Sequence, residues 1–284
     1  MLHFLDYAEL NVPILRELFA IADNIAAYEN ALARKTLVLF FPSTSLRTRV
    51  TFEKGIAALG GQALLFPPEV LDKKEALRDV TGYLANWADG LIIRHNSLPL
   101  LRELAAHSPI PVVNAMTSEN HPCEILADLY ALSKRRADFL QLQYTFVGHA
   151  GNIGRSWLAA SRALGFRFRQ CCPLGCEIPG AEIMRSLDDA VRGSDVVLTD
   201  SLPPELLDDY KPYKITLAAM QMANAGAMLN PCPPFYRGEE VSAAVMDSPF
   251  FVGYAFKESL LAVQQAVLIH LLTSKGENTP CLQP

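Results

Sequence analysis

Short apolar segments alternate with helical patterns along this chain of 284 residues, and that alternation limits its fold more than any other feature. Apolar runs of strand length that alternate with helices are typical of parallel β-sheets covered by helices. We expect strands at residues 36–41, 61–66, 90–94, 112–114, 144–148, 166–172, 196–200 and 214–217. The sequence therefore predicts an α/β protein.

A helix predicted at residues 124–136 separates the first group of these strands from the second. Pro122 precedes it, and proline suits the first turn of a helix. We therefore expect two doubly wound parallel-sheet domains, residues 1–123 and 124–255, joined by this interdomain helix. The C-terminal part of the chain, residues 256–284, begins with an apolar helical pattern and is expected to pack back on the first domain.

Composition and charge exclude several classes of function. Half of the residues are apolar and 19% are charged, which is enough for a substantial core. The formal net charge of −5 and the lack of a basic run argue against a nucleic-acid partner. The N-terminus lacks the pattern of a signal peptide, and we find no run of about eighteen apolar residues that would predict a membrane span. We expect a cytoplasmic protein that binds small molecules and no membrane.

The cysteines do not form a disulfide framework. Six of them lie at positions 123, 171, 172, 176, 232 and 281, so reduced thiols are expected. The group at 171, 172 and 176 suggests a metal site, but no second Cys or His pair follows at the spacing of a zinc finger. We expect neither a metal nor an organic cofactor.

Residues 40–53 join an apolar strand to a turn, rich in hydroxyl and guanidinium groups, that opens a helix. Backbone N–H groups at a helix N-terminus are unpaired and carry partial positive charge. Ser45 and Thr48 add hydroxyl donors. Arg47 and Arg49 add permanently charged planar forks. The alternative is a helix cap with two surface arginines, but because later segments supply matching groups, we interpret this segment as a phosphate cradle.

Two further polar groups follow expected strands. Arg94 ends the strand at 90–94, where a charged side chain needs either water or an anion. His121 precedes the rigid Pro122 at a helix start, so it can donate to a carbonyl oxygen, and Glu124 can accept from an amide N–H. Such a pair would hold a planar carbamoyl or carboxamide group. The alternative is a capped helix with an incidental histidine.

Residues 144–156 run from a strand into a glycine-rich helix start, so a dinucleotide-binding fingerprint has to be weighed. The glycine spacing does not fit the strict motif, and the next strand ends in Cys171 and Cys172 rather than in an acidic residue. A nicotinamide-dependent dehydrogenase is therefore the least favoured interpretation. Asn152 in this turn could bond a carboxylate, and Asp200 at a later strand end is placed to pair with an ammonium group.

Prolines surround Cys232, at positions 231, 233 and 234. They fix the backbone, and a cis X-Pro bond here would aim the Cys232 sulfur and nearby carbonyls into a ligand site. A rigid surface turn is the alternative interpretation.

Taken together, these segments resemble the aspartate/ornithine carbamoyltransferase family over nearly the whole chain and in the family's order. The matching segments are Phe40–Arg49, His121–Glu124, Gly148–Ser156, Asp200 and Cys232. The phosphate loop is most similar to the N-acetyl- and N-succinylornithine carbamoyltransferase branch. The resemblance implies a carbamoyl-phosphate-binding first domain, an acceptor-binding second domain, no cofactor, and a homotrimer or a dimer of trimers.

By this resemblance, the first domain holds carbamoyl phosphate. The residues implied for its phosphate are Ser45, Leu46 through its backbone N–H, Arg47 and Thr48. Arg94 and His121 would bind the carbonyl oxygen, and Glu124 the carbamoyl N–H₂. Lys73 lies in the loop that family members lend to a neighbouring subunit's site.

The resemblance assigns the acceptor to the second domain. Asn152 would bind the acceptor's carboxylate and Asp200 its amine end. Cys232 and the carbonyl of Pro233 would face the attacking amine, although Pro231 and Pro233 replace the family's His and Leu beside this cysteine. The catalytic residues so implied are Arg47, Arg94, His121, Asp200 and Cys232.

Three departures from the family pattern bear on activity. Glu124 stands where the family has Gln, which keeps an acceptor oxygen but adds a negative charge. Leu260 falls near the family's carbamoyl- or phosphate-contacting Arg, and Lys257 is the cation that could substitute. Asp200 is not followed by the Ser-Met-Gly of ornithine enzymes, which argues against plain ornithine.

The sequence thus predicts a carbamoyltransferase that moves the carbamoyl group of carbamoyl phosphate to an amine of an ornithine-like or modified amino acid. The products would be a ureido compound and phosphate. Because of Glu124, Pro231 and Leu260, the alternative is a catalytically silent homologue that binds an amino acid or an anion.

Overall fold

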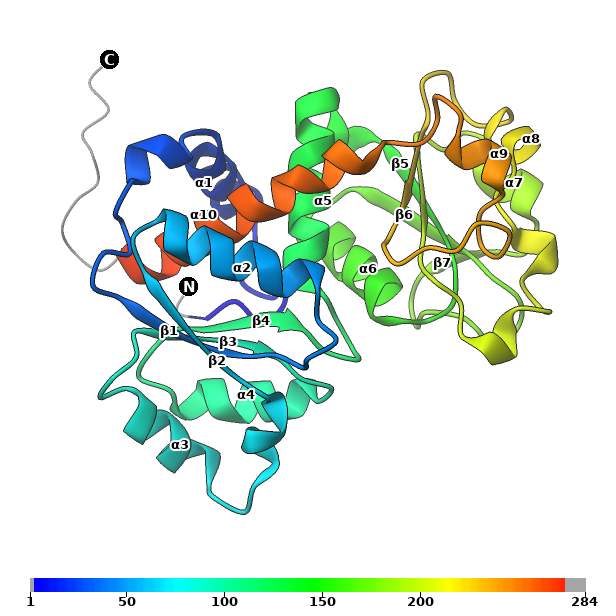
Figure 1. Ribbon diagram of the computed structural model, residues 1–284. Coiled ribbons are helices and arrows are strands. Elements are labelled where there is room, and N and C mark those ends of the chain that lie inside the picture. Colours follow the sequence, from blue (N-terminus) through cyan, green and yellow to red (C-terminus); the bar gives the residue numbers. More distant parts are fainter. Residues whose placement is uncertain (1–2, 274–284) are drawn as a thin grey trace. The chain divides into compact units, whose positions relative to one another are not determined.

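A computed structural model describes residues 3–273 of the chain as two compact α/β units (Figure 1). Within this range the first unit extends to Ala131 and resumes at Lys257, and the second runs from Leu132 to Phe256. Helix α5 (Pro122–Arg135) contributes residues to both units and is the predicted connecting helix. The division falls inside this helix, whereas we expected it between residues 123 and 124.

The first unit is built on a four-stranded parallel sheet in the order β2-β1-β3-β4. Its strands are β1 (Thr36–Phe40), β2 (Gln62–Phe66), β3 (Gly90–Arg94) and β4 (Val112–Met116). The two interior strands, β1 and β3, are almost continuously apolar and buried, as expected for parallel strands that are covered on both faces. All four strands were predicted.

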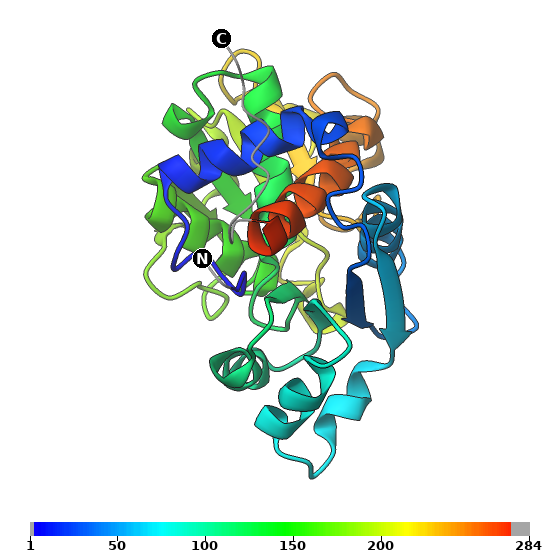
Figure 2. The same cartoon turned by 90° about the vertical axis from the view of Figure 1, so that its left-hand side faces the viewer.

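Helices cover both faces of this sheet. Helices α3 (Leu77–Leu84) and α4 (Leu98–His107) lie on one face, as Figures 1 and 2 show. The other face is covered by α1 (Val12–Asp23), α2 (Arg47–Ala58) and α10 (Ser259–Thr273). Because α10 packs against α1 and α2, the predicted return of the C-terminal helix to the first domain is confirmed for the described residues.

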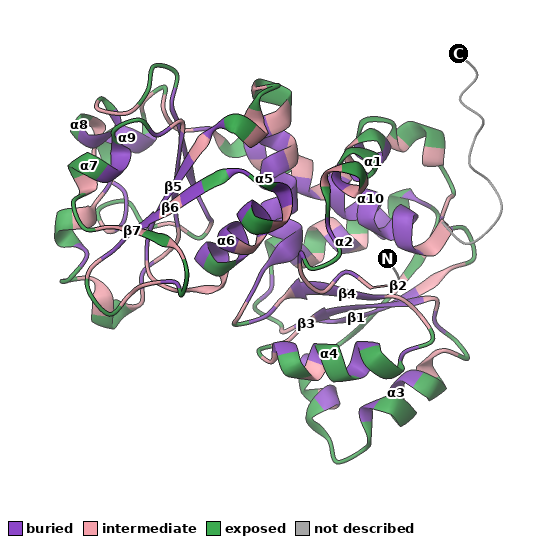
Figure 3. Cartoon of the chain, turned by 180° about the vertical axis from the view of Figure 1, so that it is seen from behind, coloured by how far each residue is buried: buried purple, intermediate pink, exposed green. Residues whose placement is uncertain are grey.

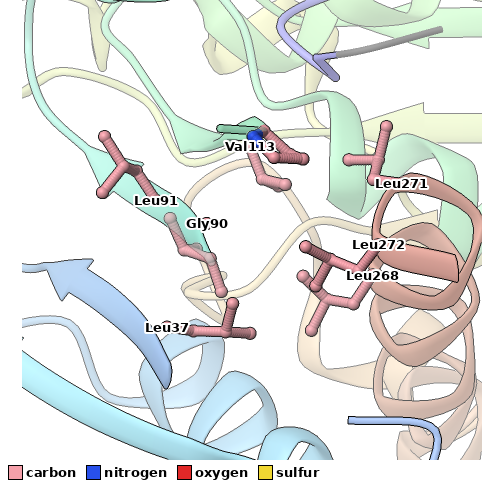
Figure 4. A pocket seen from close by; sticks show the side chains of 9 residues that line it. Leu37, Gly90, Leu91, Val113, Leu268, Leu271 and Leu272 are labelled. Atoms are coloured by element: carbon pink, nitrogen blue, oxygen red, sulfur yellow. The ribbon is translucent and has the colours of Figure 1, made fainter. Parts of the chain in front are cut away.

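Helix α10 is apolar on nearly all sides because it lies in the core of the first unit. Figure 3 draws it mostly in the colour of buried residues. Its side chains face the sheet across a seam too narrow for water, shown in Figure 4. The labelled residues there are Leu37, Gly90, Leu91, Val113, Leu268, Leu271 and Leu272.

This burial bears on the question of a membrane span. In the described part of the chain, one segment of 20 residues, Tyr254–Thr273, is long and apolar enough to cross a membrane, contrary to our expectation of none. Of its most apolar window, 61% is buried inside the structure. Packing in a protein core accounts for this composition, since a helix buried on all sides needs no polar face.

The second unit contains a five-stranded parallel sheet in the order β7-β6-β5-β8-β9. Its strands are β5 (Gln143–Val147), β6 (Arg167–Cys171), β7 (Glu182–Met184), β8 (Val196–Thr199) and β9 (Met228–Pro231). Its helices are α6 (Asn152–Leu164), α7 (Leu187–Val191), α8 (Leu217–Met220) and α9 (Ala243–Met246). Alternate residues of β5 face opposite layers: Tyr144 packs on Trp157 of α6, and Val147 joins the core that α7, α8 and α9 cover.

Short 3₁₀ helices occur in the connections of both units. They are η1 (Ile25–Tyr28), η2 (Pro68–Asp72), η3 (Phe139–Gln141), η4 (Pro204–Leu206), η5 (Lys211–Tyr213) and η6 (Tyr254–Glu258).

In the second sheet one predicted strand was wrong and two strands were missed. The strand expected at 214–217 is a single bridge from Ile215 to Val241, because α8 begins at Leu217. Strand β7 was not predicted, since three residues carry too little periodicity. Strand β9 was not predicted either, because the prolines around Cys232 hid it, but Pro231 ends an edge strand, where a missing N–H is tolerated.

The close packing of Gly154 against β5 gives a stability prediction. A Cβ at Gly154 would lie 2.5 Å from Phe146 Cε1 and 2.7 Å from Ile178 Cδ1. We expect Gly154→Ala to lower the free energy of unfolding by about 1–3 kcal/mol through overpacking. In the matched control Gly82→Ala, also in a helix, a Cβ would meet nothing within 4 Å, so a gain of about 0.5–1 kcal/mol is expected. Urea denaturation measures both, and equal midpoints for the two variants would contradict the prediction.

Candidate active site

The candidate residues of the first unit follow the carboxyl ends of its four parallel strands. Ser45 and the start of α2 follow β1, and Lys73 follows β2 through η2. Arg94 is the last residue of β3, and His121 precedes α5 after β4. Since parallel strands end at the same edge of a sheet, these side chains belong to one edge, where α/β proteins bind ligands.

The cradle after β1 combines buried hydroxyl groups with an exposed helix start. Ser45 and Thr48 are only 3% and 4% exposed. The Nη1 group of Arg94 donates to Ser45 Oγ at 3.1 Å, which joins the loop after β1 to the end of β3. No side chain caps the start of α2, and Leu46 at that position is 69% exposed. The backbone N–H groups of this first turn can therefore receive an anion from outside.

Two guanidinium groups lie close enough to repel each other. Burial is the largest cause that lowers the pKa of Arg94, and the positive charge of Arg47 lowers it further. The negative charge of Glu124 acts in the opposite direction. A bound anion would relieve this repulsion. Arg49 lies elsewhere: its Nε donates to Glu53 Oε1 at 2.7 Å one helical turn away. The pairing with Glu53 directs Arg49 along its own helix, and the role of Arg47 in the cradle stays a prediction.

His121 is held as a neutral imidazole. Its side chain is buried, and burial lowers its pKa from 6.5 to about 4, although Glu124 acts in the opposite direction. The positive charges of Arg94 and Lys257 add to the lowering. A neutral imidazole carries one N–H and can donate one hydrogen bond without bringing a net charge.

The loop that carries His121 is fixed by a buried amide network. Asn120 Oδ1 accepts from Asn114 Nδ2 at 2.6 Å and from Thr117 Oγ1 at 2.8 Å. Both asparagines also donate to the carbonyl of Leu5, in the N-terminal segment that pairs with β4. Tyr7 Oη donates to the carbonyl of Pro122 at 2.7 Å. The N-terminal segment therefore positions the start of α5, a role for which the sequence carries no recognisable signal.

Glu124 takes part in an ion cluster with Lys257 and Asp128. Lys257 Nζ donates to Glu124 Oε1 at 2.8 Å and to Asp128 Oδ1 at 2.6 Å. Burial disfavours ionisation of Glu124, but Lys257 and, more weakly, Arg47 hold the pKa of Glu124 below its usual value. We did not predict Asp128, although Glu124 and Asp128, four residues apart on a helix, share one face, and that spacing was a usable signal.

A cavity of about 300 Å³ opens beside Arg94 in the first unit, lined also by Thr44, Glu69 and Met116. His95 lies in its wall: its Nδ1 accepts from Ser97 N, so its Nε2 carries the proton and donates to Asp72. The cavity thus presents permanent positive charge from Arg94 together with acidic groups.

The candidate residues of the second unit follow three neighbouring strands. Asn152 is the first residue of α6 after β5, and Asp200 follows β8, where its Oδ1 accepts from Ser201 N at 2.9 Å. Cys232 follows β9 and is buried, with its N–H bonded to Thr199 O. Because β5, β8 and β9 are adjacent and parallel, these groups lie along one edge of the second sheet. The peptide bond Pro233–Pro234 is cis, as considered from the sequence.

Between residues 3 and 273 the structure joins no cysteines in a disulfide and gathers no metal-ligating cluster. The cysteines there, Cys123, Cys171, Cys172, Cys176 and Cys232, are all free thiols, and Cys281 lies outside the described residues. Within the same range no group of three or more His, Cys, Asp or Glu side chains could hold a metal ion.

The chain thus folds into two parallel α/β units, one with a cationic cradle and one with an amide and a carboxylate at its sheet edge. Comparison with known families gives the class of protein that has this organisation. Residues 2–134 match the aspartate/ornithine carbamoyltransferase carbamoyl-P binding domain, and residues 140–271 match the Asp/Orn binding domain of the same family. The chain belongs to the aspartate/ornithine carbamoyltransferase family, and carbamoyl transfer is the activity of that family.

Individual proteins similar to this chain support the same family. The chain is 32% identical to an ornithine carbamoyltransferase of Chromobacterium violaceum, across 97% of this chain and 98% of that protein. It is 34% identical to one of Syntrophus aciditrophicus, across 89% and 91%. The crystal structure of ornithine carbamoyltransferase from Thermus thermophilus matches with a TM-score of 0.89 at 27% identity, over 96% of this chain and 99% of that one. The branch within the family stays a prediction.

The burial of His121 predicts its titration. A histidine whose folded pKa is about 4 takes up its proton far below the pH at which the unfolded chain does, near 6.5. We expect the His121 imidazole signals in a ¹H–¹⁵N spectrum to stay those of a neutral ring from pH 8 down to about pH 5. Folded stability should fall as pH drops from 6.5 toward 4, and His121→Gln should flatten that decline. Titration of His121 near pH 6.5 would contradict a neutral donor.

Proposed function

We propose that this protein transfers the carbamoyl group of carbamoyl phosphate to an amine of an ornithine-like or modified amino acid. The observation that carries the proposal is the cradle of the first unit, where Arg94 bonds Ser45 beside the open start of α2 and close to Arg47. Clustered positive charge with buried hydroxyl donors suits a small dianion.

In this proposal the donor lies at the carboxyl edge of the first sheet. Ser45, the Leu46 N–H, Arg47 and Thr48 bind its phosphate. Arg94 and the neutral His121 donate to its carbonyl oxygen, and Glu124 accepts from its N–H₂. An uncharged imidazole fits this role because it stabilises the developing oxyanion as a hydrogen-bond donor and does not give up its proton to bulk water.

The acceptor in this proposal is held by the second unit. Asn152 binds its carboxylate, Asp200 its amine end, and Cys232 with the Pro233 carbonyl contacts the attacking amine. The neutral amine nitrogen attacks the carbamoyl carbon, the bond from that carbon to the phosphate oxygen breaks, and the nitrogen releases one proton. Phosphate and a ureido compound result. Catalysis consists mainly of positioning and of charge stabilisation around the departing phosphate.

Assembly and location are part of the same proposal. We propose a homotrimer, alone or paired into a hexamer, in the cytoplasm. The edge strand β2 exposes Leu64, Leu65 and Phe66 at 39%, 37% and 44%, which favours burial against another copy of the chain. Lys73, exposed in the loop that follows β2 and η2, would then reach the neighbouring copy's donor site.

A second candidate function is a catalytically silent homologue that binds an amino acid or an anion. It is favoured by one observation: Lys257 bonds two carboxylates, so its ammonium is not a simple replacement for the arginine that the resemblance places at Leu260. Tight ligand binding without turnover would support this candidate.

Arg47 provides a direct test of the cradle. We expect Arg47→Ala to reduce kcat/KM for carbamoyl phosphate by at least about 100-fold, because a charged donor to a buried anion contributes on the order of 1.5–3 kcal/mol and the transition state carries more charge than the substrate. Arg16→Ala, which removes an exposed arginine from α1, is the matched control and should leave kcat/KM unchanged. Retained activity in a folded Arg47→Ala protein would remove the cradle from the proposal.

The acceptor is identified by a product assay. Carbamoyl-phosphate-dependent ureido products are measured by mass spectrometry with ornithine, its N-acyl forms, shorter diamino acids, aspartate and polyamines. We expect one α-amino-acid acceptor to give a product, and plain ornithine to be a poorer acceptor because Asp200 is followed by Ser201-Leu202-Pro203. Absence of product from every acceptor, with the protein folded, would support the silent homologue instead.

A further inference from the structure

The ion cluster at the start of α5 places an unusual charge in the donor site. The side chains of Glu124 and Asp128 are 8% and 2% exposed, one turn apart on the same helix. The Lys257 side chain, 21% exposed, reaches both from η6, just before α10. All three belong to the first unit. Two carboxylates and one ammonium leave the cluster with a net negative charge.

A carboxylate differs from the amide that the resemblance leads us to expect at position 124. A glutamine can turn and present either its oxygen or its N–H₂ to a ligand, whereas an ionised glutamate only accepts hydrogen bonds. Lys257 occupies Oε1 at 2.8 Å and thereby fixes the orientation of the carboxylate. The cost of leaving a buried charged acceptor without a donor is larger than for an amide.

Lys257 is needed to keep this carboxylate charged. Without an ammonium, two buried carboxylates on one helix face would repel, and one would retain its proton. The other charged and titratable groups around Glu124 are Arg47 of α2, Arg94 of β3, His121, Cys123 and Tyr7. Only Lys257 makes a hydrogen bond that the structure records to a Glu124 side-chain oxygen within residues 3–273.

We propose that Lys257 and Asp128 hold Glu124 as an ionised acceptor that requires an N–H₂ group on the donor substrate, so that the site selects a carbamoyl group over an acyl group of the same shape. This inference rests on the proposed function of the first unit as the donor site. Lys257 is a positioning residue in it, and Glu124 contacts the substrate. Acetyl phosphate, with a methyl group in place of the N–H₂, is a compound of the same shape that such a site would reject.

Two stable phosphonates test the selection by binding alone. Phosphonoacetamide and acetonylphosphonate have the same shape and differ in an N–H₂ or a methyl group beside the carbonyl. By isothermal titration, we expect the wild-type protein to bind the amide about tenfold to a hundredfold more tightly than the ketone, the range for a charge-assisted hydrogen bond. In Glu124→Gln the ratio of the two affinities should fall to under about tenfold, the range for a neutral hydrogen bond.

Variants at Lys257 separate positioning from general stability. Lys257→Met should lower the ratio to that of Glu124→Gln, and Lys257→Arg, which keeps the charge and offers a fork to both carboxylates, should restore most of it. The matched control is Lys35→Met, which removes a lysine paired with Asp89 at 3.5 Å in the same unit and should leave the ratio unchanged.

The outcomes distinguish this inference from the function on which it rests. If the ratio of the affinities for the amide and the ketone is unchanged in Glu124→Gln, or in folded Lys257→Met, the inference is overturned. In that case, tight binding of both phosphonates still supports the proposed donor site. If Lys257→Met does not fold, the comparison of Glu124→Gln with Lys257→Arg decides. Failure of the wild-type protein to bind either phosphonate overturns the donor site, and the inference falls with it.

Discussion

Parallel pairing of the strands is the constraint on which both units depend. Strands that run in one direction must be joined by crossovers along the faces of the sheet, and their carboxyl ends then lie at one edge. In the first unit this gathers the loop after β1, the last residue of β3 and the start of α5. In the second it gathers the start of α6, Asp200 and Cys232. Within each unit, residues far apart in the chain come to one sheet edge because of strand direction.

Charge then decides what each edge can bind. The start of α2, with Arg47 and Arg94 close enough to repel, is arranged for an anion. His121 contributes a hydrogen-bond donor without a charge, since burial outweighs the attraction of Glu124. The negative charge of Glu124 would be unfavourable beside an anionic ligand, and the ammonium of Lys257, 2.8 Å from Glu124 Oε1 and shared with Asp128, offsets part of it. Glu124, which departs from the family pattern, is therefore joined to Asp128 through Lys257 in one ion cluster.

Local patterns predicted most of the architecture. The apolar runs at β1, β3, β5 and β8 are interior strands, whose continuous burial leaves a plain signal. The errors lie at the margins of the second sheet, where β7 is too short to show a period and Pro231 of β9 suggests a turn. The residues of the candidate site were likewise predictable only where the signal is local. Arg94 ends a strand and Ser45 follows one, so both could be named, whereas Tyr7 and Asn114 contact residues 115 and 109 positions away in the sequence.

The sequence by itself determined the alternating α/β order, the strand-end polar groups and the resemblance to a carbamoyltransferase, because each depends on local periodicity or on a contiguous motif. Only the tertiary structure decided which distant charges meet. Arg49 pairs with Glu53 four residues on in its own helix, a local contact, whereas Lys257 pairs with Glu124 and Asp128, 133 and 129 residues away in the sequence. The physical reason is that a distant charge pair forms only where folding brings two side chains within about 3–4 Å and removes water, and neither condition can be read from the sequence around either residue.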